Sequence, residues 1–167
     1  MIKMAALLEM FNTMNVKNAK TYIQSGNLVF QYKGSDVNAL EKKIEKKIKD
    51  TFGFDVPVLI LDAGDLPGIL KNNPYLKKKN TDLTKLYVTL FKGDYDQKAV
   101  DMINSSSYNG DEFSIQDPVI YLHLSNNYGN TKLNNNFFEN KLKIVATTRN
   151  WKTMNELQKM AEAIYHL

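Results

Sequence analysis

Apolar residues recur at helical spacing at the start of the chain and then give way to two β-prone runs. Positions 4, 7, 8 and 11 are apolar, which predicts a helix within residues 3–14. Residues 20–25 and 28–32 are rich in β-branched and aromatic types and flank Gly26-Asn27, two residues that accept a positive φ at low cost. The pattern therefore predicts a helix followed by a β-hairpin.

A second amphipathic pattern follows the hairpin. Apolar residues at positions 37, 40, 44, 48 and 52 form one stripe between Asp36, a suitable N-cap, and Gly53, a suitable C-terminal stop. Residues 56–61 then read as a strand and residues 65–70 as a short helix. The first half is predicted to run helix, strand, strand, helix, strand, helix.

Residues 71–82 are polar and interrupted by Pro74, so we interpret them as a linker between an N-terminal subdomain, residues 1–70, and a C-terminal subdomain, residues 83–167. The C-terminal subdomain is expected to contain four strands and three helices, with a hairpin in its middle and a helix that closes the chain. In order, these are a strand at 85–91, a helix capped by Asp94, strands at 112–116 and 119–124, a helix at 133–142, a strand at 143–148 and a helix at 151–165.

The two halves share the same order of elements, except that the first lacks an opening strand. A β-α-β-β-α-β unit is the ferredoxin-like arrangement, an antiparallel sheet with helices on one face. We therefore predict an α+β fold of two tandem ferredoxin-like subdomains with an extra C-terminal helix. Because the first strand lies inside such a sheet, the N-terminal half is expected to have a gap. The first alternative is that another element or another chain fills this gap, the latter by self-association through the incomplete sheet. The second is that the N-terminal half is less stable than the C-terminal half.

Composition narrows the class of protein. The chain has 167 residues, of which 43% are hydrophobic and 24% charged, which excludes a disordered tail, a collagen-like fibre and a membrane bundle. The absence of cysteine excludes disulfides and thiolate chemistry, so the expected location is the cytoplasm. The net charge is +4, but Arg149 is the only arginine. Since arginine makes the bidentate contacts typical of phosphate and base recognition, the charge adds little to a nucleic-acid hypothesis.

Two motifs resemble a known family. The run 21–30, TYIQSGNLVF, and the tail from Tyr128 through residues 146–154, ATTRNWKTM, are similar to the bacterial domain-of-unknown-function family DUF 1697. The resemblance implies two ferredoxin-like halves and no established activity. Members usually begin with a short strand and a glycine-containing loop that this sequence lacks, which suggests a later start codon, a trimmed chain or a degenerate copy.

The densest polar cluster, residues 147–151, is expected to pass from a strand into the N-terminus of a helix, where free N–H groups favour an anion. Thr148, Arg149 and Asn150 are therefore candidate ligands of a phosphate or carboxylate. The structural alternative is that Asn150 caps the helix and Arg149 pairs with a carboxylate of the other half.

Four further residues offer similar chemistry. Lys132 and Asn134 precede another expected helix start, where they bind the same anion or simply cap the helix. Ser25 and Asn27 lie at the expected hairpin tip, where they present donors or only shape the turn.

The sequence shows no conventional catalytic constellation. It has two histidines, one of them the penultimate residue His166, no base beside Ser25 and no glycine-rich phosphate loop. We therefore predict no catalytic residues, no metal site and no cofactor.

Aromatic residues favour a different ligand. Residues 86–91 partly resemble the first-strand motif of RNA-recognition domains, and Tyr87, Tyr121 and His123 could stack the bases of a single strand if they share an open sheet face. The third-strand motif of those domains is absent.

The preferred hypothesis is a non-catalytic binding module for an anionic ligand, such as a nucleotide or nucleic acid. The alternative is a structural or protein-interaction module whose motif residues stabilise the interface between the halves. An unrecognised enzyme ranks third, and no membrane partner is expected.

Overall fold

The chain folds into two units, and the first is discontinuous in sequence. The computed structural model describes residues 1–165. The first unit contains residues 1–63 together with residues from 156 onward, and the second unit contains residues 64–155. The expected linker at 71–82 therefore lies inside the second unit, and the closing helix contributes to both. No helix within the described residues is long and apolar enough to cross a membrane.

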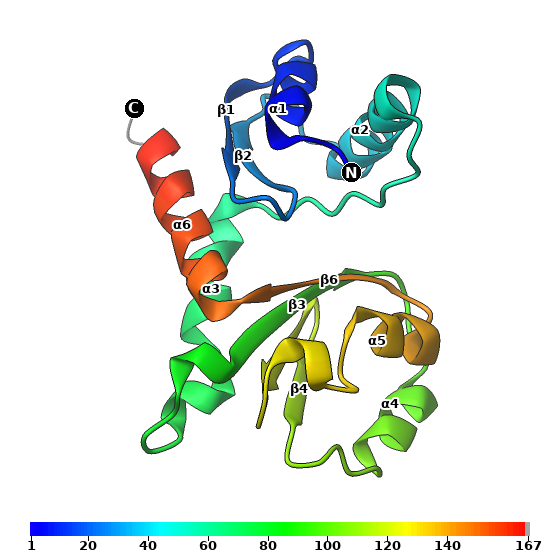
Figure 1. Ribbon diagram of the computed structural model, residues 1–167, viewed down its shortest axis with the longest axis vertical. Helices are drawn as coiled ribbons and strands as arrows, with labels where there is room; N and C mark the ends of the chain where they lie inside the picture. The colour runs from blue at the N-terminus through cyan, green and yellow to red at the C-terminus, as the bar shows by residue number, and fades with distance from the viewer. Residues whose placement is uncertain (166–167) are drawn as a thin grey trace. The chain divides into compact units, whose positions relative to one another are not determined.

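The first unit holds two helices over one hairpin (Figure 1). Its elements are α1 (Met4–Asn12), β1 (Lys17–Tyr22), β2 (Asn27–Gln31), α2 (Val37–Phe52) and the second half of α6 (Trp151–Tyr165). The core lies on α1 and α2, where residues at helical spacing are buried: Met4, Leu7, Met10, Phe11, Leu40, Ile44 and Ile48. As predicted, Asp36 caps α2 by accepting the N–H of Ala39 at 2.9 Å, and Gly53 ends it with φ 77°.

The hairpin forms, but its turn is longer than predicted. Strands β1 and β2 pair antiparallel, with Tyr22 opposite Asn27. The four residues between them include two with positive φ, Ile23 at 48° and Gly26 at 76°. The first strand therefore ends at Tyr22 and not at Ser25.

The strand predicted at residues 56–61 does not form. This segment joins no sheet, and the described residues of the first unit form one sheet, the two-stranded β1–β2. A run of apolar residues becomes a strand only if another strand satisfies its backbone, and here carboxylates from α2 take that place, as described below.

The second unit contains a four-stranded antiparallel sheet. Its helices and strands are α3 (Leu66–Lys71), β3 (Leu86–Lys92), α4 (Gln97–Asn104), β4 (Glu112–Gln116), β5 (Val119–His123), α5 (Asn135–Leu142) and β6 (Val145–Asn150), with short 3-10 turns at Pro74–Lys77, Leu83–Lys85 and Tyr128–Asn130. The strand order is β4-β5-β3-β6, so β3 pairs with both β5 and β6. Helix α4 is capped by Asp96, which accepts the N–H of Lys98 at 2.9 Å, and not by Asp94.

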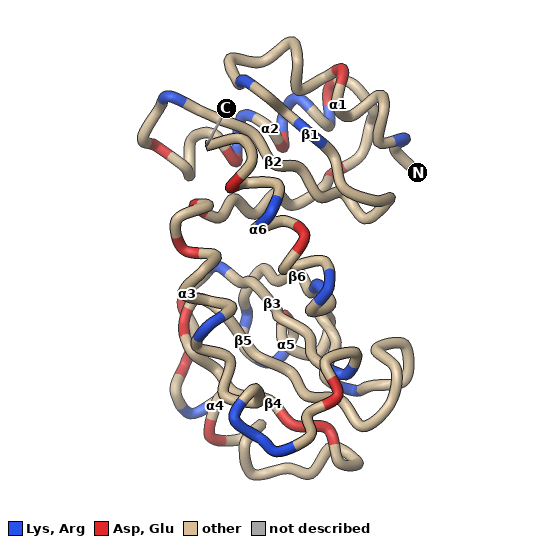
Figure 2. Tube along the Cα trace, turned by 90° about the vertical axis from the view of Figure 1, so that its left-hand side faces the viewer, with Lys and Arg blue, Asp and Glu red and all other residues tan. Residues whose placement is uncertain are grey.

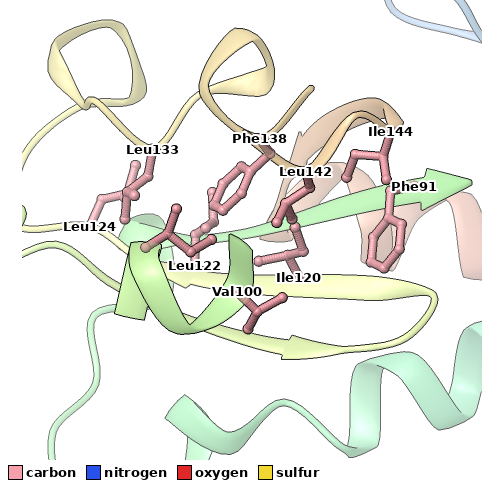
Figure 3. Packing of buried hydrophobic residues seen from close by; sticks show 10 residues of the cluster. Phe91, Val100, Ile120, Leu122, Leu124, Leu133, Phe138, Leu142 and Ile144 are labelled. Atoms are coloured by element: carbon pink, nitrogen blue, oxygen red, sulfur yellow. The ribbon is translucent and has the colours of Figure 1, made fainter. Parts of the chain in front are cut away.

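Helices α4 and α5 cover one face of this sheet. Val100 from α4 and Phe138 and Leu142 from α5 meet Ile120 and Leu122 of the inner strand β5 in one cluster (Figure 3). The expectation that helices occupy one face only is wrong for this unit. On the other face, the buried Tyr121 donates its hydroxyl to the carbonyl of Ile69 in α3 at 2.7 Å.

Candidate functional site

Arg149 lies on β6, an outer strand of the four-stranded sheet, and its side chain forms hydrogen bonds with the same strand. Its Nη1 donates to Thr147 Oγ1 at 2.7 Å and to the carbonyl oxygen of Thr148 at 2.9 Å. Partial burial lowers the pKa of the guanidinium because desolvation disfavours its charge. The side chain therefore covers the unpaired edge of β6 with hydrogen bonds.

Thr148 joins three elements. Its hydroxyl shares a hydrogen bond with that of Thr89 in β3 at 2.7 Å and donates to Asn135 Oδ1 at the start of α5 at 2.6 Å. The N–H of Asn135 in turn donates to the hydroxyl of Tyr128 at 3.1 Å, and the Tyr128 ring stacks on Tyr87 with centroids 5.2 Å apart. This network fixes β3, β6 and α5 relative to one another.

Both helix starts that could receive an anion are already capped. Asn150 Oδ1 accepts the N–H of Thr153 at 2.8 Å, and Asn134 Oδ1 accepts the N–H of Phe137 at 3.0 Å. The exposed Lys132 makes no hydrogen bond or ion pair with any residue from 1 to 165. Local capping is thus the observed use of the asparagines, and Lys132 is the anion-binding candidate whose charge stays in solvent.

Ser25 and Asn27 belong to the first unit and shape the hairpin turn. Asn27, 6% exposed, donates through Nδ2 to Ser25 Oγ at 2.8 Å and to the carbonyl of Tyr22 at 3.3 Å. These bonds hold the turn closed, so both residues stabilise the hairpin.

The three residues proposed to stack bases do not share a face. Tyr87 lies opposite Leu122 in the register of β3 and β5, and Leu122 points into the core beneath α4 and α5. Tyr121 and His123 fall on the other face, and Tyr121 is 1% exposed. The premise of a common open face is therefore wrong, because neighbouring strand residues point to opposite sides.

A charged cluster that sequence reasoning missed lies beside His123. Lys78 Nζ contacts both carboxylate oxygens of Glu112, at 2.6 and 2.7 Å, and His123 Nδ1 lies 3.4 Å from the same carboxylate. The Tyr75 ring lies 5.5 Å from the His123 ring and 5.3 Å from the Lys78 ammonium. The hydrogen bond from Lys78 lowers the pKa of Glu112, while burial raises that of Tyr75. Its members come from a predicted linker and two strands, which only the fold brings together.

A shallow cavity of about 360 Å³ lies between α3 and the β4–β5 turn. Its polar lining includes Asp65, Asn72, Gln116 and Asp117. Residues 1–165 contain no group of three or more histidine, cysteine, aspartate or glutamate side chains placed to hold a metal ion.

The most unusual backbone lies in the first unit, in residues 54–62, which we call the 54–62 segment. Helix α2 holds it through two carboxylates: Glu41 Oε1 accepts the N–H of Ile60 at 2.7 Å, and Glu45 Oε1 accepts that of Val58 at 2.8 Å. Residues four apart on a helix are about 6 Å apart along its axis, close to the spacing of every second residue in an extended chain. The segment is therefore held extended, with Val58 and Ile60 packed against the core.

The second unit uses the same device. Glu139 Oε1 of α5 accepts the N–H of Ala146 in β6 at 2.9 Å, while the other edge of β6 pairs with β3. A carboxylate from the preceding helix thus satisfies one edge of the final extended segment in both units. Glutamates are common on the polar face of an amphipathic helix, so the sequence alone does not indicate that these accept backbone N–H groups of a later segment.

The 54–62 segment and β6 differ at the edge that faces away from the glutamates. In an extended chain, successive N–H and C=O groups point to alternate sides, so Leu59 and Leu61 face away from the glutamates. No residue from 1 to 165 forms a hydrogen bond with the backbone N–H or C=O of Leu59 or Leu61. In the second unit this edge of β6 pairs with β3, whereas the corresponding edge of the 54–62 segment is open.

These features define an α+β protein whose described residues form six helices and two antiparallel sheets. A family model described as "Protein of unknown function (DUF1697)" matches residues 1–121, and the chain belongs to that family. The match contains the run 21–30 and confirms the resemblance to this family, whereas the tail from Tyr128 lies outside the matched residues; no activity is established for the family.

The fold has a solved relative. The structure of the conserved bacterial protein SP0830 from Streptococcus pneumoniae matches with a TM-score of 0.74 and 18% sequence identity, covering 97% of this chain and 90% of that chain. At this identity the likeness concerns the fold alone. No curated protein matches the sequence.

Proposed function

We propose that both units follow the ferredoxin-like arrangement, with no counterpart of the central strand in the first unit within residues 1–165. The order β4-β5-β3-β6, with β3 inside the sheet and helices α4 and α5 between the strands, supports this for the second unit. The series α1, β1, β2, α2 and the 54–62 segment parallels α4, β4, β5, α5 and β6, and the shared glutamate contact strengthens the parallel. The counterpart of β3 is the element that the first unit does not contain within residues 1–165.

We further propose that the chain is a non-catalytic protein-interaction module that receives an extended polypeptide strand at the 54–62 segment. The observation that carries this proposal is the open edge at Leu59 and Leu61, beside side chains that already pack in the core. Unpaired strand edges bind other strands through main-chain hydrogen bonds.

The test uses a labelled synthetic peptide with the sequence of residues 85–92, which contains β3, the strand that pairs with β6 in the second unit. Fluorescence anisotropy of dilute protein should rise with saturable binding. A matched peptide with proline at the positions of Val88 and Leu90 should not bind, because proline has no N–H for the ladder. Equal binding of both peptides, or of neither, contradicts the proposal.

An anionic ligand near Lys132 is the second candidate. The supporting observation is the exposed ammonium beside the start of α5, although Asn134 and Tyr128 already bind the N–H groups of Phe137 and Asn135 there. If this candidate is correct, a mononucleotide titration at low salt should give binding that Lys132→Ala abolishes and Lys141→Ala leaves unchanged. Identical titrations for the two variants would exclude a site at Lys132.

A further inference from the structure

We propose that the outer side of α2 is a binding surface for the phosphate backbone of double-stranded DNA, independent of base sequence. This surface, which we call the lysine face, consists of five exposed residues of the helix: Lys42, Lys43, Lys46, Lys47 and Lys49. It does not include the 54–62 segment, so it stands independently of the function proposed for that segment.

Helical spacing gathers these lysines on one side of α2. At about 100° per residue, the five positions fall within about 160° of the helix circumference. The apolar residues Leu40, Ile44 and Ile48 occupy the remaining side and are buried in the core of the first unit. The lysine face therefore points into solvent, and Figure 2 marks its residues in blue.

The acidic residues of α2 leave this face strongly positive. Glu41 and Glu45 lie on the core side of the helix, where their carboxylates accept the backbone N–H groups of the 54–62 segment. Asp50 is the acidic residue of the helix that lies among the lysines. The lysine face thus presents five positive charges with one negative charge between them, which is an arrangement that attracts a polyanion.

Three of the five ammonium groups are not used within the protein. Lys46 pairs with Asp50, and Lys49 Nζ lies 2.8 Å from Asp55 Oδ1. The exposed Lys42, Lys43 and Lys47 form no hydrogen bond or ion pair with any residue from 1 to 165. Overall charge says little about a nucleic-acid partner for this chain, whereas three unpaired ammonium groups on one rigid helix form a defined array.

The side chains around the lysines favour phosphates over other anionic partners. A helix that lies in a membrane surface inserts its apolar side, and that side of α2 is already buried. Single-stranded nucleic acid is held by aromatic side chains that stack on its bases, and the lysine face has none. It also has no arginine to read base edges. Charge contacts to a regular array of phosphates are what this composition supports.

The dimensions of α2 match a DNA duplex. The helix has 16 residues and is therefore about 24 Å long, and Lys42 to Lys49 span about 10 Å of it. Phosphates follow one another every 3.4 Å or so along each DNA strand, so this distance covers about three of them. The major groove of B-DNA is about 12 Å wide and admits a helix, whereas the corresponding groove of duplex RNA is narrow. We therefore name DNA as the partner.

Fluorescence anisotropy with a labelled DNA duplex of random sequence tests the proposal on the full chain. Each neutralised phosphate contributes about 0.9 to the logarithmic salt slope, so three contacts weaken binding roughly 40-fold between about 50 and 200 mM salt. The triple variant Lys42→Gln, Lys43→Gln, Lys47→Gln should reduce this slope by about 2.7 and the affinity at low salt by at least roughly tenfold.

A second triple variant controls for net charge. Lys79→Gln, Lys98→Gln, Lys141→Gln removes three exposed lysines of the second unit that make no ion pair with residues 1–165. It should bind the duplex within about threefold of the wild type, because charges far from the contact are screened. Circular dichroism checks that both variants keep their helices, and both should still bind the β3 peptide if that separate function is correct.

The remaining outcomes overturn the proposal. An equal loss of affinity in the two triple variants would mean that overall charge, and not the lysine face, attracts DNA. Absence of binding at low salt excludes the site. Tighter binding to a single strand of the same length replaces the duplex as the partner. Binding to phosphatidylserine vesicles without binding to the duplex assigns the lysine face to a membrane surface.

Discussion

Most polar residues that stand out in the sequence bind backbone within a few positions of themselves. Asn27, Asn134 and Asn150 each satisfy a turn or a helix start, and Arg149 bonds the carbonyl of the preceding residue. Such short-range roles follow from residue type and position, so the capping role considered for the two later asparagines is confirmed. A polar motif with high local hydrogen-bonding capacity is therefore weak evidence for a ligand.

Asp111 accepts three hydrogen bonds from residues far from it in the sequence. Its carboxylate accepts the N–H and the hydroxyl of Ser125, both at 2.8 Å, and the hydroxyl of Thr131 at 2.5 Å. Burial raises the pKa of Asp111, but the hydrogen bonds from Thr131 and Ser125 outweigh it and lower the pKa overall. The ionised form thus ties the loop before β4 to the loop after β5.

Asp111→Asn should lower the free energy of unfolding by about 1–2 kcal/mol at pH 7, because these hydrogen bonds favour the charged acceptor. A lowered folded-state pKa contributes stability above the unfolded value near 4, and this stability is lost as the pH falls through the folded value. Urea denaturation should therefore show the gap between wild type and variant closing below about pH 4. The exposed Asp94→Asn serves as control, and a gap that is constant with pH contradicts the role.

At the scale of elements, pattern predicts helices better than it predicts sheets. The stripe of α2 and its two caps follow from local spacing, and the structure confirms them. The run 56–61 has every local feature of a strand and still forms none, since a strand depends on a partner elsewhere in the chain. The prediction that Tyr87 and Tyr121 share a face is wrong for the same reason. The register between β3 and β5 decides which residues lie on the same face, and it places these two side chains on opposite faces.

Glu41 offers a direct test of how the 54–62 segment is held. It is 5% exposed and accepts the N–H of Ile60. Glu41→Ala leaves that partly buried N–H without this acceptor, so the free energy of unfolding should fall by about 1–3 kcal/mol. Hydrogen exchange at Ile60 should accelerate, whereas the exposed Glu9→Ala should change neither quantity. Unchanged exchange at Ile60 would mean that the carboxylate does not hold the segment.

At the scale of the whole molecule, the two units differ in how well their sheets are buried. All residues of β5 except His123 are buried, whereas every residue of β1 and β2 except Asn27 is at least partly exposed. A two-stranded sheet is marginal without further packing. We therefore expect the first unit to be the less stable part of the protein.

Hydrogen exchange in dilute protein should resolve this difference. Amides paired between β1 and β2 should exchange faster than those paired between β3 and β5, because the hairpin opens without unfolding the second unit. Addition of the β3 peptide should slow exchange in the first unit selectively. Equal protection of the two sheets in dilute protein would contradict the assignment of lower stability to the first unit.

The division of α6 between the units has a consequence for synthesis on the ribosome. Residues 64–155 are contiguous, so the second unit can fold as soon as they have emerged. The first unit begins earlier but needs residues from 156 onward, including Ile164, whose carbonyl accepts a hydrogen bond from Gln31. The part of the protein that is translated first is consequently the last to be completed, and its apolar surface stays uncovered while the rest of the chain is made.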